Sequence, residues 1–335
     1  MKSARPKPTV AILSPYYDRA AGVEPTFQSI AHQTYPDFEA IIWDDKSKDG
    51  TWSEMQRVVA KLADSRFTIY RHDSNLGFTQ GLNLALSKTD ADYIAIVGSG
   101  DSCDPRRIER QVQALESNPD AVFCATASTT TDPLSGVTFF DSDYSKEVIT
   151  FSDIAEHCPF THGSVMYRGS AIRAAGGYEA AYVWCADWDL WFRLLRDRNA
   201  LFLREVLYRR IAQPDGASFN PEKSIVQIAH KHLAIELSRV DEELRTKILT
   251  EVRAAGISSV IPANHLGYTR DLVRRNIKLY LMGRRAAGDT MSARLRGLGV
   301  IPPAKYRAFL LAAKLLSRLP FRTDGLIRPA RALPR

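Results

Sequence analysis

Three short segments of this 335-residue chain place carboxylates beside glycines or aromatic rings, and each could take part in chemistry. Asp44 and Asp45 end an apolar run, where a carboxylate can accept hydrogen bonds from a nucleobase or a ribose. The same residue types favour turns and helix N-termini, so a solvated capping turn is the alternative. Composition alone leaves both interpretations open.

The second segment is Gly98-Ser99-Gly100-Asp101, after another apolar run. Its small residues would let a diphosphate approach the backbone, and Asp101 or Asp104 could hold a divalent cation, which prefers oxygen ligands. A dinucleotide-binding glycine fingerprint is disfavoured because its third glycine position is Cys103 and because the segment follows a fourth strand, not a first. A plain glycine-rich turn is the other alternative.

The third segment runs from Trp184 to Trp191 (WCADWDLW), and helical spacing places Trp184, Trp188 and Trp191 on one face. Such a stripe forms part of a core or a platform for a sugar. Asp187 could be a general base, because aromatic walls raise the pKa of a carboxylate by desolvation. It could equally be a first-turn acid that the helix dipole favours.

Alternating strand and helix patterns must position these segments. Apolar runs predict strands at 9–13, 38–43, 67–71 and 92–97, with helices near 24–32, 52–62 and 78–86 and a helix opened by Pro105. This alternation predicts a mostly parallel sheet with helices on both faces. Since ligands bind beyond the carboxyl ends of such strands, the polar loops after the first, second and fourth strands should gather at one rim.

The second half of the chain has a different pattern. Beyond about residue 150 the sequence predicts an α+β mixture, with a helix near 184–196 and a strand near 200–208, and it looks helical from 221 onward. After Glu251 there are 17 Lys or Arg against three Asp, so this tail carries +14 and the preceding residues −7. An acidic body with a basic tail suits a membrane surface at least as well as nucleic acid.

Composition excludes several other classes. The chain is 45% hydrophobic and 25% charged, which is ordinary for a globular protein. Its four cysteines form no CxxC pair, which argues against structural zinc and a compact disulfide framework. Neither a secretory signal nor an apolar stretch of roughly 18 residues is apparent. We therefore expect a cytoplasmic protein, with a peripheral position on the inner face of the membrane as a further option.

In order and spacing the segments resemble those of the family 2 glycosyltransferases, which have the nucleotide-diphospho-sugar transferase (GT-A) fold. The matching stretches are TVAILSPYYD, SIAHQTYPDFEAIIWDDKSKDGT, NLGFTQGLN, DYIAIVGSGDSCDP, HGSVMYRGSAIRAAGGY, ADWDLWFRL and LYRRIAQPDGAS. The resemblance implies an α/β GT-A catalytic domain at 1–220, with a nucleotide-binding half at 8–105 and an acceptor-binding half at 106–220. The basic helical region would then be 221–335.

Position by position, the resemblance implies that Asp187 is the catalytic base. It implies nucleotide-sugar binding by Pro15, Tyr17, Asp45, Arg71, Asn75, Gly77, Asn83, Ser99, Gly100 and Asp101. It implies acceptor or sugar contacts by His162, Gly163, Trp184, Trp188, Asp189 and Arg210.

Three departures from the family pattern bear on chemistry. The family's Asp-x-Asp-Asp is Gly98-Ser99-Gly100-Asp101 here, so Gly100 occupies the position of the main metal-ligating aspartate. Either Asp101, alone or with Asp104, holds a Mn²⁺ or Mg²⁺ ion, or metal dependence is weakened. The histidine often found after the late arginine is missing, with Ala212 and Gln213 in that region, and the glutamate of the Glu-Asp motif is Ala186.

The expected function is inverting transfer of a sugar from a UDP- or dTDP-linked donor to a hydroxyl of a glycan or lipid-linked acceptor in cell-surface polysaccharide synthesis. The degenerate motif keeps a catalytically silent sugar- or nucleotide-binding protein as the alternative. A nucleotidyltransferase would need a triphosphate loop that SPYYDRAAG does not supply, and no nucleic-acid partner is expected. Tyr306–Leu319, with Phe309, Leu310, Ala313 and Leu316 on one side, predicts a basic amphipathic helix that binds a membrane surface or packs on the catalytic domain.

Overall fold

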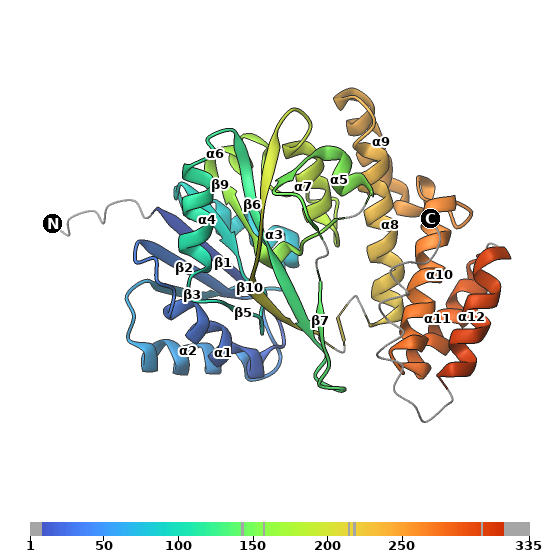
Figure 1. Cartoon of the computed structure of the whole chain (residues 1–335), viewed down its shortest axis with the longest axis horizontal. Coiled ribbons are helices and arrows are strands. Elements are labelled where there is room, and N and C mark those ends of the chain that lie inside the picture. Colours follow the sequence, from blue (N-terminus) through green and yellow to red (C-terminus); the bar gives the residue numbers. More distant parts are fainter. Residues whose placement is uncertain are drawn as a thin grey trace. The chain divides into compact units, whose positions relative to one another are not determined.

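The computed structural model describes residues 9–141, 144–156, 158–213, 215–216, 219–302 and 304–317. These residues fall into two compact units that divide between Ile211 and Ala212. The first unit is a sheet flanked by helices and the second is helical, as the ribbon shows (Figure 1). The sequence prediction placed this division slightly later, between residues 220 and 221.

The first unit contains a ten-stranded sheet, counted over the described residues. Its strands are β1 (Val10–Tyr16), β2 (Phe38–Asp44), β3 (Phe67–Arg71), β4 (Tyr93–Ile96), β5 (Ser102–Cys103), β6 (Ala121–Thr131), β7 (Thr138–Phe140), β8 (Val148–Ile149), β9 (Val165–Arg168) and β10 (Asn199–Ile211). Its helices are α1 (Ala20–Ala31), α2 (Thr51–Leu62), α3 (Phe78–Leu86), α4 (Arg107–Glu116), α5 (Phe151–Glu156), α6 (Gly169–Ala174) and α7 (Ala186–Leu194), with a 3₁₀ turn at His162–Ser164.

The strand order is β3-β2-β1-β4-β9-β6-β10-β5. The first four strands in this order are mutually parallel, β9 is antiparallel to both neighbours, and β6 is parallel to β10. The predicted mixed α/β architecture is confirmed. The predicted bounds of β3 and α3 match those observed, whereas β1 continues to Tyr16 and α4 begins at Arg107, so Pro105 precedes its first turn.

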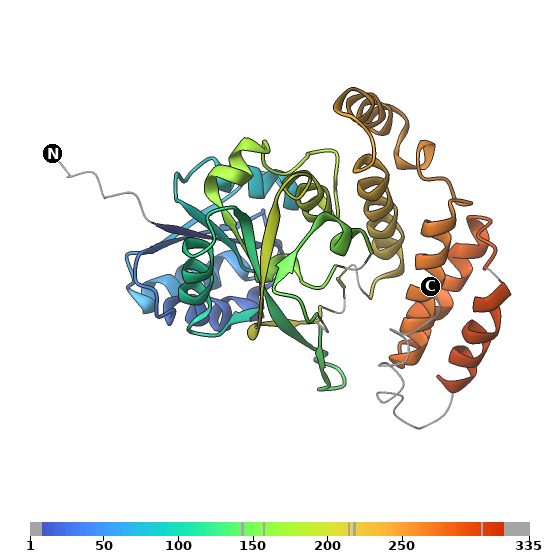
Figure 2. The ribbon, with the colours of Figure 1, turned by 45° about the horizontal axis from the view of Figure 1, so that its top comes forward.

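Both faces of the sheet are covered, which explains why its central strands are apolar throughout. On one face, Ile12 belongs to a core cluster that includes Phe27 of α1 and Met55 of α2. On the other face, Trp43 contacts α3 so closely that a Cβ on Gly81 would lie 2.6 Å from its indole nitrogen. The turned view shows helices on both sides of the strands (Figure 2).

Tyr208 of β10 ties the loop after β4 to the 3₁₀ turn. Its hydroxyl accepts a hydrogen bond from Gly98 N (2.8 Å) and donates one to Asp101 Oδ2 (2.6 Å). A Cβ added to Gly163 would lie 2.0 Å from this hydroxyl. Gly163 is therefore required by the close approach of the buried tyrosine.

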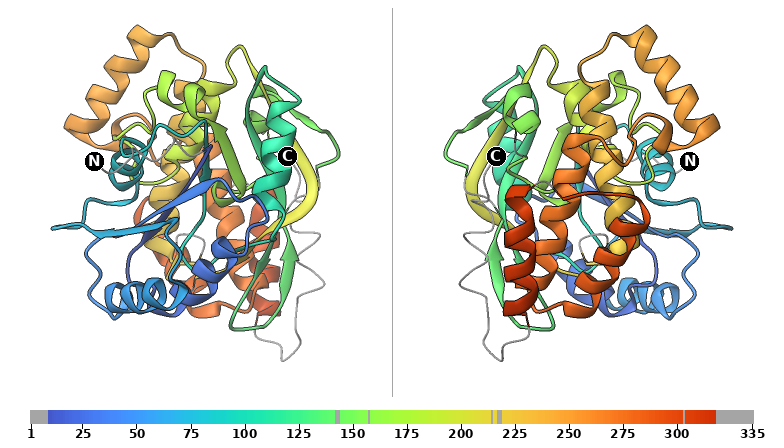
Figure 3. Two further views of the ribbon diagram at one scale, coloured as in Figure 1. Left: turned by 90° about the vertical axis from the view of Figure 1, so that its left-hand side faces the viewer. Right: turned by 90° about the vertical axis from the view of Figure 1, so that its right-hand side faces the viewer.

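The second unit consists of α8 (Pro221–Leu237), α9 (Glu242–Ala255), α10 (Leu266–Leu281), α11 (Arg285–Gly297) and α12 (Ala304–Leu316), with a 3₁₀ turn at Ile257–Ser259. Asn220 caps α8 by accepting a hydrogen bond from Lys223 N (3.1 Å), as expected for an asparagine before Pro221. Helices α10, α11 and α12 lie side by side (Figure 3). Of the helices in the described ranges, none has the length and hydropathy needed to cross a bilayer.

We predict that Gly163→Ala destabilises the first unit by about 1–3 kcal/mol, the usual cost of overpacking a closed site. The free energy of unfolding in urea measures this change. Gly50→Ala is the control, because a Cβ there would meet its nearest neighbour at 3.8 Å, an ordinary contact. Equal stability of the two variants would contradict the packing role of Gly163.

Candidate functional site

The loops that follow β1 and β2 are joined by hydrogen bonds at one rim of the sheet. Asp18 N donates to Ser47 Oγ (2.9 Å), and Lys48 N donates to Asp18 Oδ1 (2.7 Å). The loop after β4 reaches the same region, since β4 is the other neighbour of β1. Thr26 of α1 holds it, accepting from Gly100 N (3.0 Å) and donating to Asp101 O (2.7 Å). The predicted gathering of polar loops is confirmed.

Several residues expected to bind the nucleotide lie at this rim. Pro15 is near the end of β1, opposite Trp43 of β2, and Tyr17 follows the strand with 39% of its surface exposed. Asn75 is exposed in the loop between β3 and α3. Their roles in nucleotide binding stay predictions.

Asp45 has a clear structural role. Its nearly buried carboxylate accepts hydrogen bonds from His72 Nδ1 (2.8 Å), Leu76 N (2.8 Å) and Gly77 N (2.9 Å). These bonds fix the loop at which α3 begins, where Gly77 has a φ of +80°. Whether Asp45 also accepts a hydrogen bond from a base stays a prediction.

Two further residues of the predicted nucleotide set also contact the protein itself. Arg71 Nε lies 2.8 Å from Asp44 Oδ2, and its Nη2 donates to Ser47 O (2.6 Å). Asn83 donates through Nδ2 to Tyr178 O (2.7 Å) and accepts from Tyr178 N (2.9 Å). Both side chains therefore brace the loops around the rim, and any ligand contacts would be additional.

Asp101 is held from both sides. Tyr208 donates to Oδ2, and Ile211 N donates to Oδ1 (3.0 Å). Desolvation raises the pKa of Asp101 to about 6, although the positive charge of Arg210 opposes this shift. Ser99, half-buried, lies in the same loop.

The side chains around Asp101 do not fit the Mn²⁺ or Mg²⁺ ion that the resemblance implied. Gly100 offers no ligand, and both carboxylate oxygens of Asp101 already accept hydrogen bonds. Asp104 lies 3.5 Å from Arg106 Nε and 3.6 Å from Arg209 Nη2. Over the described residues there is no group of three His, Cys, Asp or Glu side chains arranged to hold a metal.

Asp187 lies in the first turn of α7, and its Oδ1 is 2.9 Å from Trp188 N. Desolvation raises the pKa of Asp187 to about 6, again against the charge of Arg210. The carboxylate in turn raises the pKa values of Tyr167 and Tyr178, so it lies near both rings. Cys185, which precedes the helix, has a φ of +58°, an unusual conformation that recurs at functional sites.

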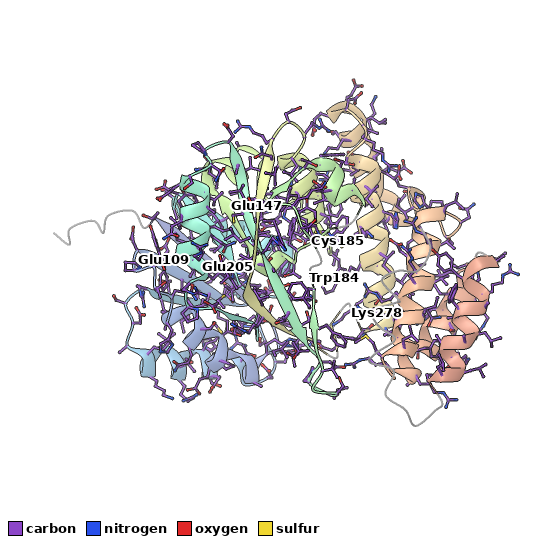
Figure 4. All side chains as sticks on the ribbon, in the orientation of Figure 1. Glu109, Glu147, Trp184, Cys185, Glu205 and Lys278 are labelled. Atoms are coloured by element: carbon purple, nitrogen blue, oxygen red, sulfur yellow. The ribbon has the colours of Figure 1, made fainter. Side chains whose placement is uncertain are left out.

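The tryptophan stripe is corrected by the structure. Trp184 precedes α7, so it does not share a helical face with Trp188 and Trp191; Figure 4 labels it beside Cys185. Trp191 is buried and donates to Tyr167 Oη (2.8 Å), as a core residue would. Trp184 and Trp188 are both half-buried, and their sugar contacts stay predictions.

Asp189 points into the protein rather than toward the rim. It is buried and forms an ion pair with Arg193 (2.9 Å) one turn along α7. Arg193 also donates to Gly177 O (2.8 Å), so the pair anchors α7 to the segment after α6. The structure gives Asp189 a bracing role, and its predicted acceptor contact stays a prediction.

His162 belongs to an aromatic cluster. Its Nε2 is 2.8 Å from Tyr178 Oη, and its ring meets Phe78 edge-on with centroids 5.7 Å apart. Desolvation lowers the pKa of His162 to about 3, so the ring is neutral at physiological pH. The roles of Tyr178 and Tyr208 could not be predicted from the sequence, because a tyrosine hydroxyl carries no motif of its own.

Arg210 follows Tyr208 by two residues in β10, and alternation places the two side chains on one face of the strand. Its Nη1 donates to Thr130 Oγ1 (3.4 Å) in β6. Throughout the described part of the chain, Arg210 has no carboxylate within ion-pair distance. The site thus contains a half-buried guanidinium near Asp101 and Asp187, both of whose pKa values it lowers.

Residues 11–167 match the family described as glycosyl transferase family 2. The chain is also 30% identical over 207 residues to the glycosyltransferase EpsE of Bacillus subtilis (strain 168), covering 60% of this chain and 72% of EpsE. The chain belongs to the family 2 glycosyltransferases. It is 26% identical to the amylovoran biosynthesis glycosyltransferase AmsE of Erwinia amylovora, over 65% of this chain and 83% of AmsE.

Solved structures of glycosyltransferases share the fold of this family 2 chain. TarS 1–349 from S. aureus, in complex with UDP-GlcNAc, matches with a TM-score of 0.57 at 15% identity, covering 92% of each chain. The mannosyltransferase PcManGT from Pyrobaculum calidifontis, in complex with GDP-Man and Mn²⁺, matches with a TM-score of 0.57 at 15% identity, over 98% of this chain and 85% of that one. At such identities these likenesses establish the fold alone.

We predict that Asp187→Asn makes this glycosyltransferase more stable at pH 8. The folded pKa of about 6 exceeds the value of about 3.9 for an unfolded aspartate, so stability falls as pH rises through that interval. The neutral amide avoids this loss, and its advantage should disappear below about pH 4.

Melting temperatures measured across this pH range would show the effect. Asp189→Asn is the control with the opposite sign, since it breaks the buried ion pair with Arg193. A lower melting temperature for Asp187→Asn at pH 8 would show that the ionised carboxylate does not destabilise the fold.

Proposed function

We propose that this chain is an inverting glycosyltransferase in which Asp187 is the general base. The observation that carries the proposal is the raised pKa of Asp187, about 6, in an aromatic surrounding and within reach of the charge of Arg210. A base with a pKa near the working pH is ionised yet still able to hold a proton, which suits proton transfer. A carboxylate that served only to cap α7 would gain nothing from desolvation.

The reaction follows from this assignment. The Asp187 carboxylate takes the proton of an acceptor hydroxyl as that oxygen forms a bond to the anomeric carbon of the donor sugar. The bond from this carbon to the phosphate oxygen breaks on the opposite face, and the nucleoside diphosphate leaves with the electron pair. Attack opposite to departure inverts the anomeric configuration.

The donor and acceptor classes rest on likeness to other proteins. TarS binds UDP-GlcNAc and PcManGT binds GDP-Man, which supports a nucleoside-diphosphate sugar as donor, and we favour a UDP- or dTDP-linked one. AmsE is named for amylovoran biosynthesis, which supports a polysaccharide product. The acceptor would be a hydroxyl of a glycan or of a lipid-linked glycan.

A second candidate is a sugar- or nucleotide-binding protein without turnover. It is favoured by the glycines at positions 98 and 100 and by Ala186 in place of the usual glutamate. Such a protein would bind a nucleotide but release none from its sugar. Turnover of a nucleotide sugar in the presence of an extracted glycan acceptor separates the two candidates.

We expect Asp187→Asn to lower turnover by about 10²–10⁴-fold, the usual contribution of positioned proton transfer, and to leave nucleotide affinity nearly unchanged. Release of nucleoside diphosphate measures the first effect and calorimetric titration the second. Asp90→Asn is the control, because it makes the same change at an exposed position. Wild-type turnover in Asp187→Asn would remove this residue from the mechanism.

The C-terminal unit supports a further part of the proposal, attachment to an anionic membrane surface. Helix α12 buries Tyr306 and Ala313, the latter on its predicted apolar side, and it packs on α10. It also exposes a second apolar face with Leu311 (61% exposed) and Leu315 (51%), beside the exposed Arg307. Residues 318 and 319 of the predicted helix lie outside the described residues.

An apolar face flanked by basic side chains complements a lipid surface of negative charge. Helix α12 itself lies beside α10 (Figure 3). The net charge of +14 after Glu251 adds to that attraction. Attachment at the inner face of the membrane would bring the site close to a lipid-linked acceptor.

We predict that the double substitution Leu311→Glu and Leu315→Glu abolishes flotation with vesicles that contain phosphatidylglycerol. Leu244→Glu is the control, since Leu244 is similarly exposed (45%) but lies on α9. Size-exclusion chromatography of the same proteins detects a second copy on this face instead. Equal flotation of the three proteins would refute attachment through α12.

A further inference from the structure

The loop after β4 departs from the family pattern in sequence, and its backbone conformation favours the glycine found there. Gly100, at the position of the usual metal-ligating aspartate, has a φ of +88°, in the left-handed region that favours glycine. It also lies against α1, where a Cβ on Gly22 would be 2.6 Å from Gly100 Cα. The positive φ therefore favours glycine at position 100, and the close approach of the loop to α1 requires glycine at position 22.

The remaining acids near this loop are committed to the protein. Asp101 accepts hydrogen bonds from Tyr208 Oη at Oδ2 and from Ile211 N at Oδ1. Asp104 lies between two arginines, at 3.5 Å from Arg106 and 3.6 Å from Arg209. Over the described residues, no three His, Cys, Asp or Glu side chains are grouped as the oxygen-rich ligand set of a divalent cation would be.

A diphosphate leaving group nevertheless requires positive charge near it. Arg107 is fully buried and donates to Ile96 O and Val165 O, so it cannot reach a ligand. Arg71 is paired with Asp44. Both of these arginines therefore already bind groups of the protein itself.

Arg210 is placed differently. It lies on the face of β10 that carries Tyr208, the residue that reaches the glycine loop, and it forms no ion pair over the described residues. Its Nη1 donates to Thr130 Oγ1 (3.4 Å), and that hydroxyl donates to Asp141 Oδ2 (2.7 Å), which orients the guanidinium. Its charge acts on both Asp101 and Asp187, so the guanidinium is within electrostatic reach of the glycine loop and of the proposed base.

We propose that Arg210 binds the donor's diphosphate in place of a divalent cation, and that this chain binds its nucleotide without metal. The inference rests on the proposed function. The planar guanidinium can donate two parallel hydrogen bonds to phosphate oxygens, as an arginine commonly does, and it stabilises the charge that develops on the leaving group. The glycines at 98 and 100 leave room for the phosphates to approach.

The test is calorimetric titration of the full-length protein with UDP, GDP and dTDP, first in EDTA and then in MnCl₂. We expect one nucleotide to bind with the same Kd in both buffers. In EDTA, Arg210→Gln should weaken that binding by about 10–100-fold, as the loss of hydrogen bonds to a charged group does. The Kd of Arg210→Lys should lie between those of the wild type and Arg210→Gln. Lysine keeps the positive charge but cannot donate two parallel hydrogen bonds.

Arg209→Gln is the matched control, since Arg209 is the adjacent, exposed arginine whose side chain points to the other face of β10. Thermal melts confirm that each variant is folded, and Arg210→Lys serves if the glutamine variant is not. Binding that appears only with Mn²⁺, or equal Kd values for Arg210→Gln and Arg209→Gln, would overturn the inference and leave the proposed function intact. Failure of the wild type to bind any of the nucleotides would overturn the donor assignment itself.

Discussion

The arrangement of the site depends on the hydrogen bonds of the buried Tyr208 hydroxyl. A buried hydroxyl is costly unless it is hydrogen-bonded, and this one accepts a hydrogen bond from Gly98 N and donates one to Asp101. Its approach requires glycine at 163, which sets the 3₁₀ turn that carries His162. One side chain from late in the sequence thereby positions segments that lie about 45 and 110 residues earlier. The β10 strand also carries Arg210, so the same element holds the loop and supplies the charge.

Desolvation is the second constraint, and it acts in two directions. The aromatic cluster of Tyr167, Tyr178 and His162 removes water from the neighbourhood of Asp187 and raises the pKa of this carboxylate. The same removal costs folding stability whenever Asp187 is ionised. The site explains three features that an ordinary core would not need. They are the buried tyrosines, the neutral His162 and the left-handed backbone conformation of Cys185.

The fold was predictable from sequence because its signals are local. The strand at 67–71 and the helix at 78–86 have the predicted bounds, since apolar periodicity and the flanking turns determine them. Asp187 and the glycine loop were identified through motifs, and the structure places both near Arg210. The sequence could not show that Asp189 pairs with Arg193, that Trp184 lies before α7, or that Asp45 braces a loop. The last depends on a contact between residues 31 positions apart, whereas the first two depend on local burial and on where a helix begins; apolar periodicity encodes none of them.

The electrostatics of the site link donor binding to base strength. Arg210 is the cation that favours the ionised forms of both Asp101 and Asp187. A diphosphate bound to Arg210 would share that charge, and would bring its own negative charges near both acids. Both effects raise the pKa of Asp187, because each disfavours a carboxylate more than a carboxylic acid. Under the proposed assignment, Asp187 is therefore a weak base in the free protein and a stronger one once the donor is in place, when an acceptor proton has to be removed.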